Sequence, residues 1–175
     1  MFDLTGKTAI ITGSSRGIGR SIATQMALHG AKVVVSSRKV EACQIVADEI
    51  NEACKDSEGG AIVIPCNISD KTALQMLVDE TKEQLGKIDI LVCNAASNPF
   101  FGSMMDIPSE SFDKIMHNNI KSNHVLSQLV LPQMKERKDG VIIIVSSIGG
   151  LRGSAILGAY NMSKACLLYT SPSPR

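Results

Sequence analysis

The sequence predicts an α/β fold in which helices cover both faces of a doubly wound parallel sheet, so that the domain has three layers. Two observations lead to this prediction. Short segments rich in valine and isoleucine recur along the chain, and their continuous apolar character is typical of strands buried on both faces. Between them, apolar residues recur every three or four positions, as on a helix that packs along one side. Strands that alternate with helices form parallel sheets with right-handed crossovers.

Five strands are predicted, and their spacing leaves room for a helix in each interval. They are Thr8–Thr12, Lys32–Ser36, 61–65, 88–93 and 141–146. In sheets of this kind, ligands bind beyond the carboxyl ends of the strands. We therefore expect the functional residues in the segments that follow these strands.

The helices between the strands are predicted from their apolar stripes and from the glycines or polar residues at their ends. The predicted segments run from Ile18 to about Gly30 and over residues 40–54, 72–85 and 111–135. The last segment contains Pro132, which lacks a backbone N–H and is expected to break or kink the final turns. No internal repeat interrupts the pattern, so residues 1–165 are predicted to form one domain.

The bulk composition excludes several classes of function. The chain has 175 residues, a formal net charge of +1 and only 3% aromatic residues. These values give no indication of a surface for nucleic acid or for an anionic membrane. No apolar run reaches the roughly 20 residues that a membrane-spanning helix needs, and the first residues lack the layout of a signal peptide.

The cysteines and histidines give no indication of disulfides or metal binding. The five cysteines include no Cys-x-x-Cys pair and are expected to be small buried side chains in a reducing compartment. The three histidines show no metal-binding spacing with cysteines or carboxylates. A cytoplasmic protein without a resident metal is the expectation.

A glycine-rich turn joins the first predicted strand to the first predicted helix. Its sequence, Thr12-Gly-Ser-Ser-Arg-Gly-Ile-Gly19, has the spacing Gly-x-x-x-Gly-x-Gly. Glycines let a pyrophosphate approach the main-chain N–H groups at a helix N-terminus. An ordinary glycine-rich turn is the alternative, but the position between a strand and a helix favours dinucleotide binding. The candidate residues are Gly13, Ser15, Arg16, Gly17, Ile18 and Gly19.

The end of the second strand indicates which dinucleotide is bound. It runs into Ser36-Ser-Arg-Lys39, where a carboxylate would normally hold the free 2′-hydroxyl of NAD. Arg38 instead offers a fork of donors for a phosphate, and Arg16 could join it. Ser37 and Arg38 are therefore predicted to bind NADP, and a solvated basic pair at a strand end is the alternative.

Tyr160 and Lys164 carry the predicted chemistry. Four residues apart on a helix, they share one face, and an ammonium beside a phenol favours the phenolate. Ser147, thirteen residues before Tyr160 and close to the end of a strand, could hold the oxygen of an alcohol or ketone. Ser146 competes for this role, but the spacing to Tyr160 favours Ser147. Such a set can move a proton on and off a carbonyl oxygen.

These motifs occur in an order that resembles the classical short-chain dehydrogenase/reductase family. The resemblance covers residues 4–165 and also includes Cys93-Asn-Ala-Ala96 and Asn119. It implies a Rossmann-like domain that binds a nicotinamide dinucleotide and transfers hydride between the nicotinamide and a carbonyl carbon.

The resemblance also implies a role for individual residues. Tyr160 acts as the general acid/base, Lys164 assists it and contacts the nicotinamide ribose, and Ser147 orients the substrate oxygen. Asn119, which its register favours over Asn118, holds a water that links Lys164 to solvent. The other cofactor contacts are Asn67 and Ile68 at the adenine end and Asn94 and Ala95 after the fourth strand, with Asn94 expected to stabilise the sheet.

The predicted function is an NADP(H)-dependent oxidoreductase that interconverts a ketone or aldehyde with an alcohol. Residues 97–103 are similar to those of NADP-preferring carbonyl reductases, and Phe100 and Phe101 either line a substrate pocket or pack on the core. An extended-type nucleotide-sugar epimerase or dehydratase is disfavoured by the glycine spacing, and a catalytically silent dinucleotide-binding fragment or sensor is the other alternative. The expected partners are a small substrate and, in the full-length protein, further copies in a homodimer or homotetramer.

Residues 166–175 do not fit the pattern. Pro172 and Pro174 forbid a continued helix, so a helix that begins near Tyr160 should stop after about two or three turns. We interpret this segment as a truncation, a frameshift or foreign sequence. The resemblance implies that the family normally continues with further strands and a nicotinamide-contacting loop. The chain as it stands is therefore expected to be inactive or weakly active.

Overall fold

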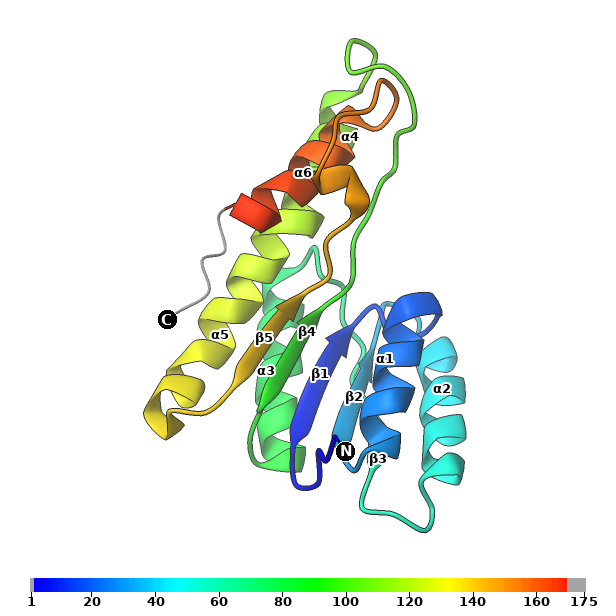
Figure 1. The fold of residues 1–175 in the computed structure, drawn as a ribbon, viewed down its shortest axis with the longest axis vertical. Coiled ribbons are helices and arrows are strands. Elements are labelled where there is room, and N and C mark those ends of the chain that lie inside the picture. The colour runs from blue at the N-terminus through cyan, green and yellow to red at the C-terminus, as the bar shows by residue number, and fades with distance from the viewer. Residues whose placement is uncertain (1, 170–175) are drawn as a thin grey trace.

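The computed structural model describes residues 2–169, which form five parallel strands with helices on both faces (Figure 1). The predicted doubly wound sheet is therefore confirmed. In residues 2–169, no helix combines the length and the apolar character that crossing a membrane requires. In chain order the elements are β1 (Thr8–Thr12), α1 (Gly17–Leu28), β2 (Lys32–Ser36), α2 (Val40–Ala53), β3 (Gly60–Val63), α3 (Lys71–Leu85), β4 (Ile90–Cys93), α4 (Ser109–Met116), the π-helical turn η1 (His117–Lys121), α5 (Ser122–Arg137), β5 (Val141–Ile144), the 3₁₀ turn η2 (Ile148–Gly150) and α6 (Gly158–Tyr169).

The strand order is β3-β2-β1-β4-β5, so the chain moves from β1 to one edge and then returns past β1 to the other. β1 is central, with Ile10 paired to Val34 of β2 and to Leu91 of β4. The chain leaves β1 toward α1 on one face and leaves β4 toward α4 and α5 on the other (Figure 1). A switch point of this kind opens a crevice at the carboxyl ends of the strands.

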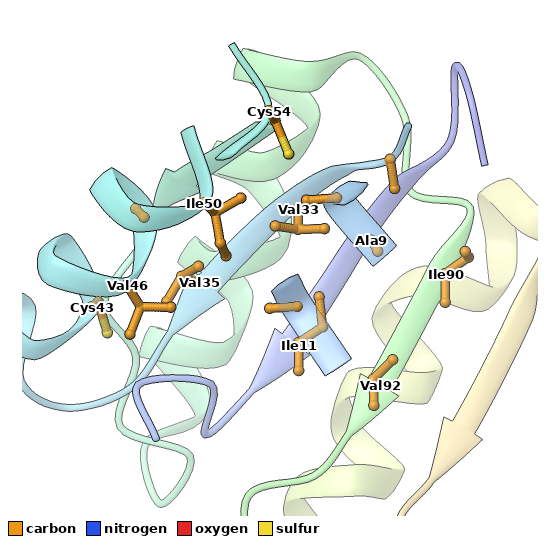
Figure 2. Close-up of a cluster of buried hydrophobic side chains, with 14 residues drawn as sticks. Ala9, Ile11, Val33, Val35, Cys43, Val46, Ile50, Cys54, Ile90 and Val92 are labelled. Carbon is orange, nitrogen blue, oxygen red and sulfur yellow. The ribbon is translucent and has the colours of Figure 1, made fainter. Parts of the chain in front are cut away.

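The sheet separates two buried apolar clusters. Along β1 the side chains alternate, so Ala9 and Ile11 belong to the cluster under α1 and α2, while Ile10 belongs to the cluster under α3 and α5. Figure 2 shows the first cluster, in which Val46 and Ile50 of α2 lie over the strands. Burial on both faces explains why the strands are uniformly apolar.

Four of the cysteines are buried, as predicted, and Cys166 is partly exposed. Burial raises the pKa of the Cys66 thiol to about 11, with a smaller contribution from Asp70. It raises the pKa of Cys93 to about 12. Both thiols therefore stay protonated at neutral pH and pack as small apolar groups.

The segment predicted as one helix over residues 111–135 consists of α4, η1 and α5. The π-helical turn changes the direction in which the side chains of η1 point, and the apolar pattern of the sequence does not predict such a turn. α5 continues past Pro132 to Arg137, so the helix is not broken there. Pro132 leaves the carbonyl of Gln128 without its usual partner, but both residues are exposed and water can satisfy that carbonyl.

α6 runs from Gly158 to Tyr169, so the first four residues of the predicted tail continue this helix. The remaining residues, 170–175, which include Pro172 and Pro174, lie outside the described residues.

Candidate active site

Each glycine of the turn between β1 and α1 stands where a side chain would strain the backbone or clash with a neighbour. Gly13 and Gly17 have φ angles of 69° and 57°, in the left-handed region that favours glycine. Gly19 allows close packing, because a Cβ there would lie 2.5 Å from Asn94 Nδ2 and 2.5 Å from the carbonyl oxygen of Gly13. The turn is therefore folded tightly against the segment that follows β4.

The N-terminus of α1 is open to a ligand. Arg16 precedes the helix in an extended conformation, and its side chain makes no capping hydrogen bond. Gly17 is exposed and a Cβ there would meet nothing within 4 Å, and the Ile18 side chain is 65% exposed. Ser15, in the same turn, is partly exposed. Since the first N–H groups of a helix lack intrahelical partners, this end can receive an anion.

Asn94 and Thr12 connect the turn to the end of β4. Asn94 Nδ2 donates to the carbonyl oxygens of Thr12 at 2.9 Å and of Gly13 at 3.2 Å. Thr12 Oγ1 accepts the N–H groups of Asn94 and Ala95, each at 3.1 Å. The Asn94 amide is thus used by the main chain, as expected for a residue that stabilises the sheet edge.

Ser14 supports the turn in a way that the sequence pattern does not indicate. Its side chain is fully buried, and its Oγ donates to the carbonyl oxygen of Ile11 at 2.6 Å. The same oxygen accepts the N–H of Ser36 at 2.8 Å. Ser14 therefore joins the turn to the end of β2, and nothing in the sequence distinguishes it from its neighbour Ser15.

The residues after β2 present a positive charge to solvent. Ser37 Oγ accepts the N–H of Lys39 at 3.4 Å and lies 3.1 Å from Cys43 Sγ, which helps to begin α2. Arg38 is exposed, and within residues 2–169 no carboxylate pairs with the guanidinium of Arg38 or of Arg16. Both side chains are available to an anionic group.

Asn67 and Ile68 lie next to this segment. The N–H of Cys66 donates to the carbonyl oxygen of Ser37 at 3.1 Å, so the chain after β3 continues alongside the chain after β2. Asn67 is exposed, and its Oδ1 accepts the N–H of Ser69 at 3.2 Å. Ile68 is partly buried against the second apolar cluster.

Tyr160 and Lys164 lie on one face of α6, as their spacing predicts. Lys164 Nζ is 5.7 Å from the centre of the Tyr160 ring. The lysine is only 4% exposed, and its Nζ donates to the carbonyl oxygen of Val145 at 2.8 Å. Burial lowers the pKa of the Lys164 ammonium, because the charged form loses hydration.

Ser146 and Ser147 differ in what their hydroxyls do. Ser146 Oγ donates to the carbonyl oxygen of Lys164 at 3.1 Å and so connects the end of β5 to α6. Ser147 Oγ accepts the N–H of Gly149 at 3.1 Å and caps η2, which packs on α6. Ser147 keeps its own proton for a further acceptor, which favours it over Ser146 for contact with a substrate.

Asn118 and Asn119 both bind Ser97, in the loop after β4. Asn119 Oδ1 accepts the Ser97 N–H at 2.8 Å, and Asn119 Nδ2 donates to the Ser97 carbonyl oxygen at 3.1 Å. Asn118 Nδ2 donates to Ser97 Oγ at 3.0 Å. Asn119 also reaches α6, because its Nδ2 donates to Ser163 Oγ at 3.0 Å. Its connection to α6 therefore passes through Ser163, which nothing in the sequence pattern indicated.

Mostly apolar side chains pack together beside Tyr160, between the loop after β4 and the start of α6, and leave no room for a water molecule. Phe100 is one of these side chains, whereas Phe101 is 70% exposed and is not. The two segments are joined by a hydrogen bond of 3.0 Å from the N–H of Gly102 to the carbonyl oxygen of Ile156. The other residues of this cluster include Asn98, Met104, Ile107, Ile115 and Leu157.

These elements meet at the carboxyl edge of the sheet, where η2 and α6 follow β5 and the glycine-rich turn follows β1 (Figure 1). The chain belongs to the short chain dehydrogenase family, whose family model matches residues 7–171. The predicted resemblance is thereby confirmed.

Particular relatives are similar over nearly the whole chain. Dehydrogenase/reductase SDR family member 4 of Bos taurus is 39% identical over 168 residues, which are 94% of this chain and 58% of the relative. A 7α-hydroxysteroid dehydrogenase solved with NADH and 7-oxo glycochenodeoxycholic acid is 37% identical, with a TM-score of 0.87 over 95% of this chain and 65% of that structure. A metagenomic short-chain oxidoreductase solved with NADP is 34% identical, with a TM-score of 0.85 over 92% of this chain and 71% of that structure. The chain thus spans 58% of the length of the curated bovine relative.

Proposed function

We propose that the whole protein is an NADP(H)-dependent oxidoreductase that interconverts a ketone or aldehyde with the corresponding alcohol. The observation that carries this proposal is the position of the buried Lys164 ammonium 5.7 Å from the centre of the Tyr160 ring on α6. This helix packs against the turn η2 that Ser147 caps, and the Ser147 hydroxyl proton has no acceptor among the described residues. Membership of the short chain dehydrogenase family and relatives named dehydrogenase/reductase support it.

The residues of this chain would transfer a proton to and from the substrate oxygen. In reduction, the Tyr160 hydroxyl donates its proton to the carbonyl oxygen while the carbonyl carbon accepts a hydride, and Ser147 Oγ–H donates to the same oxygen to orient it. In oxidation, Tyr160 removes the proton from the alcohol. Lys164 stabilises the phenolate that forms, since an ammonium nearby favours the charged form. NADP supplies or accepts the hydride when it is bound.

The proposed role of Asn119 is to hold a water that connects Lys164 to solvent. The side-chain amide donates both its hydrogens to Ser97 and Ser163, so an oxygen of Asn119 is the group that would bind the water. The main-chain carbonyl oxygen of Asn119 also accepts from Asn123 Nδ2 at 2.8 Å. The Lys164 ammonium has three donors, of which Val145 takes one.

The described residues fit a dinucleotide with a 2′-phosphate. The uncapped N-terminus of α1, with Gly13, Gly17 and Gly19 behind it, would receive the pyrophosphate through the N–H groups near Ser15 and Ile18. Arg38 and Arg16 would pair with the 2′-phosphate beside Ser37, since no carboxylate occupies their guanidinium groups in residues 2–169. The remaining contacts would come from Asn67 and Ile68 at the adenine and from Ala95, Tyr160 and Lys164 at the nicotinamide end.

The two neighbouring serines provide the test. In the whole protein, Ser147→Ala should lower kcat for ketone reduction by about 100-fold, the range of a lost donor to a developing oxyanion. Ser146→Ala is the matched control, because its hydroxyl donates to a backbone carbonyl and should leave kcat within about threefold. NADPH oxidation with diketones and a 7-oxo bile acid is the assay, and the same assay on the 175-residue chain tests its predicted weak turnover. Equal losses in both variants would reject the assignment of Ser147.

The cytoplasmic location and the homo-oligomeric state stay predictions from the sequence.

A further inference from the structure

A series of hydrogen bonds begins in the loop after β3. The N–H of Ser69 donates to Asn67 Oδ1 at 3.2 Å, and Ser69 Oγ donates to Asn118 Oδ1 at 2.6 Å. Asn118 Nδ2 donates in turn to Ser97 Oγ at 3.0 Å. The series thus leads from Asn67, at the proposed adenine end of the cleft, to the loop after β4.

The series continues from Ser97 to the helix that carries the catalytic tyrosine. Asn119 binds both the N–H and the carbonyl oxygen of Ser97, at 2.8 and 3.1 Å. Its second amide hydrogen goes to Ser163 Oγ at 3.0 Å, and Ser163 Oγ donates to the carbonyl oxygen of Tyr160 at 2.7 Å. Both hydrogens of the Asn119 amide are therefore used, which leaves its side chain one orientation.

The interior members of this series are shielded from water. Asn119 and Ser163 are 0% exposed, and Asn118 is 6% exposed. Because solvent cannot replace a lost partner at such positions, each bond constrains the next. The π-helical turn η1 holds the two consecutive asparagines, and both of them contact Ser97.

We propose that Ser69, Asn118 and Ser163 are positioning residues, which couple the adenine end of the cofactor cleft to Tyr160 through this series of bonds. We call the series the Asn67–Tyr160 bridge. The proposal rests on the proposed function, since that function assigns the two ends to cofactor binding and acid–base chemistry. Binding at Asn67 then stiffens α6 around Tyr160 through these hydrogen bonds.

A measurement without ligand tests whether the bridge constrains its members. Ser163→Ala should make the Ser97 N–H exchange with deuterium about fivefold faster by NMR, as expected when the Asn119 side chain loses a partner. Ser163→Thr keeps the hydroxyl and should restore slow exchange. Ser127→Ala is the matched control, because Ser127 Oγ also donates to a carbonyl in its own helix, that of Asn123 at 2.8 Å, without bridging. Unchanged exchange of the Ser97 N–H in Ser163→Ala would overturn the proposal.

A second measurement tests the coupling itself, with adenosine 2′-monophosphate as a probe of the adenine end alone. In the wild type, saturating probe should slow exchange of the amides around Tyr160 about threefold. Ser69→Ala keeps the N–H that bonds to Asn67, so it should bind the probe normally but lose this slowing. Slowing that is absent from the wild type, or equal in the variant, contradicts the coupling. If the wild type does not bind the probe, the NADP assignment fails instead, and the exchange of the Ser97 N–H still decides whether the bridge exists.

Discussion

The two halves of the carboxyl edge use their polar side chains in opposite ways. In the cofactor half, Thr12, Ser14 and Asn94 bond to main-chain groups of neighbouring strands. In the catalytic half, no residue of the described chain accepts the hydroxyl protons of Ser147 and Tyr160. The first half therefore presents backbone N–H groups in a fixed shape, whereas the second presents side-chain hydroxyls whose protons are unused within the described chain. The comparison predicts that side-chain losses lower stability in the first half and turnover in the second.

Lys164→Met should have a very large effect on turnover, because it removes the ammonium beside Tyr160 and keeps the length of the side chain. We expect kcat of the whole protein to fall by about 100- to 10,000-fold. Steady-state NADPH oxidation measures this, and Lys135→Met, on the exposed side of α5, is the control. If Lys164→Met retained most of its turnover, the result would contradict the prediction that side-chain losses in the second half lower turnover.

The same lysine predicts how stability depends on pH. Burial lowers the Lys164 pKa in the folded protein, so the unfolded chain holds this proton at pH values where the folded protein has released it. Between the lowered pKa and the ordinary lysine value, the free energy of unfolding should therefore rise with pH. Urea unfolding over the alkaline range should show this rise in the wild type and not in Lys164→Met. If the free energy of unfolding changed with pH in the same way in the wild type and in Lys164→Met, the result would contradict this prediction.

Arg38 differs from the other side chains of the cofactor half, because its proposed role depends on its charge and not on bonds to the main chain. Arg38→Asp should lower the ratio of kcat/KM for NADPH over NADH by about 10- to 100-fold, as the 2′-phosphate would lose its partner and meet a carboxylate. Arg20→Asp is the control, since the Arg20 guanidinium already pairs with Glu49 at 2.6 Å. An unaltered ratio would remove Arg38 from the 2′-phosphate site.

Asn94→Ala should affect stability more than chemistry. It leaves the carbonyl oxygens of Thr12 and Gly13 without their side-chain donor, which should lower the free energy of unfolding by about 1–3 kcal/mol. Thermal or urea unfolding measures this, with Gln25→Ala at an exposed position of α1 as the control. A large fall in kcat at unchanged stability would place Asn94 with the reactive residues instead.

Features that depend on local pattern were predictable from the sequence. β1 and β2 begin and end where their apolar runs do, because both strands are buried on both faces. Tyr160 and Lys164 share a helix face because their spacing matches one helical turn. β3 is shorter than predicted and ends at Val63, two residues before Pro65, which cannot donate to the sheet.

Features that depend on tertiary contacts were not predictable. A π-helical turn adds one residue to a helix and has no apolar period of its own, so η1 was read as part of one long helix. Ser14 and Ser163 resemble any other serine until the fold brings them to Ser36 and Asn119. The sequence indicated the residues proposed to carry the chemistry and the supporting role of Asn94, but not the supporting roles of Ser14 and Ser163.

The most direct test of the proposed chemistry is the turnover of Tyr160→Phe in the whole protein. This variant keeps the ring and removes only the hydroxyl that would carry the proton. We predict that kcat falls at least about 1,000-fold, while the Kd for NADPH stays within about threefold and the melting temperature is unchanged. A Tyr160→Phe variant that reduces ketones at the wild-type rate would contradict the assignment of the acid–base role to this residue.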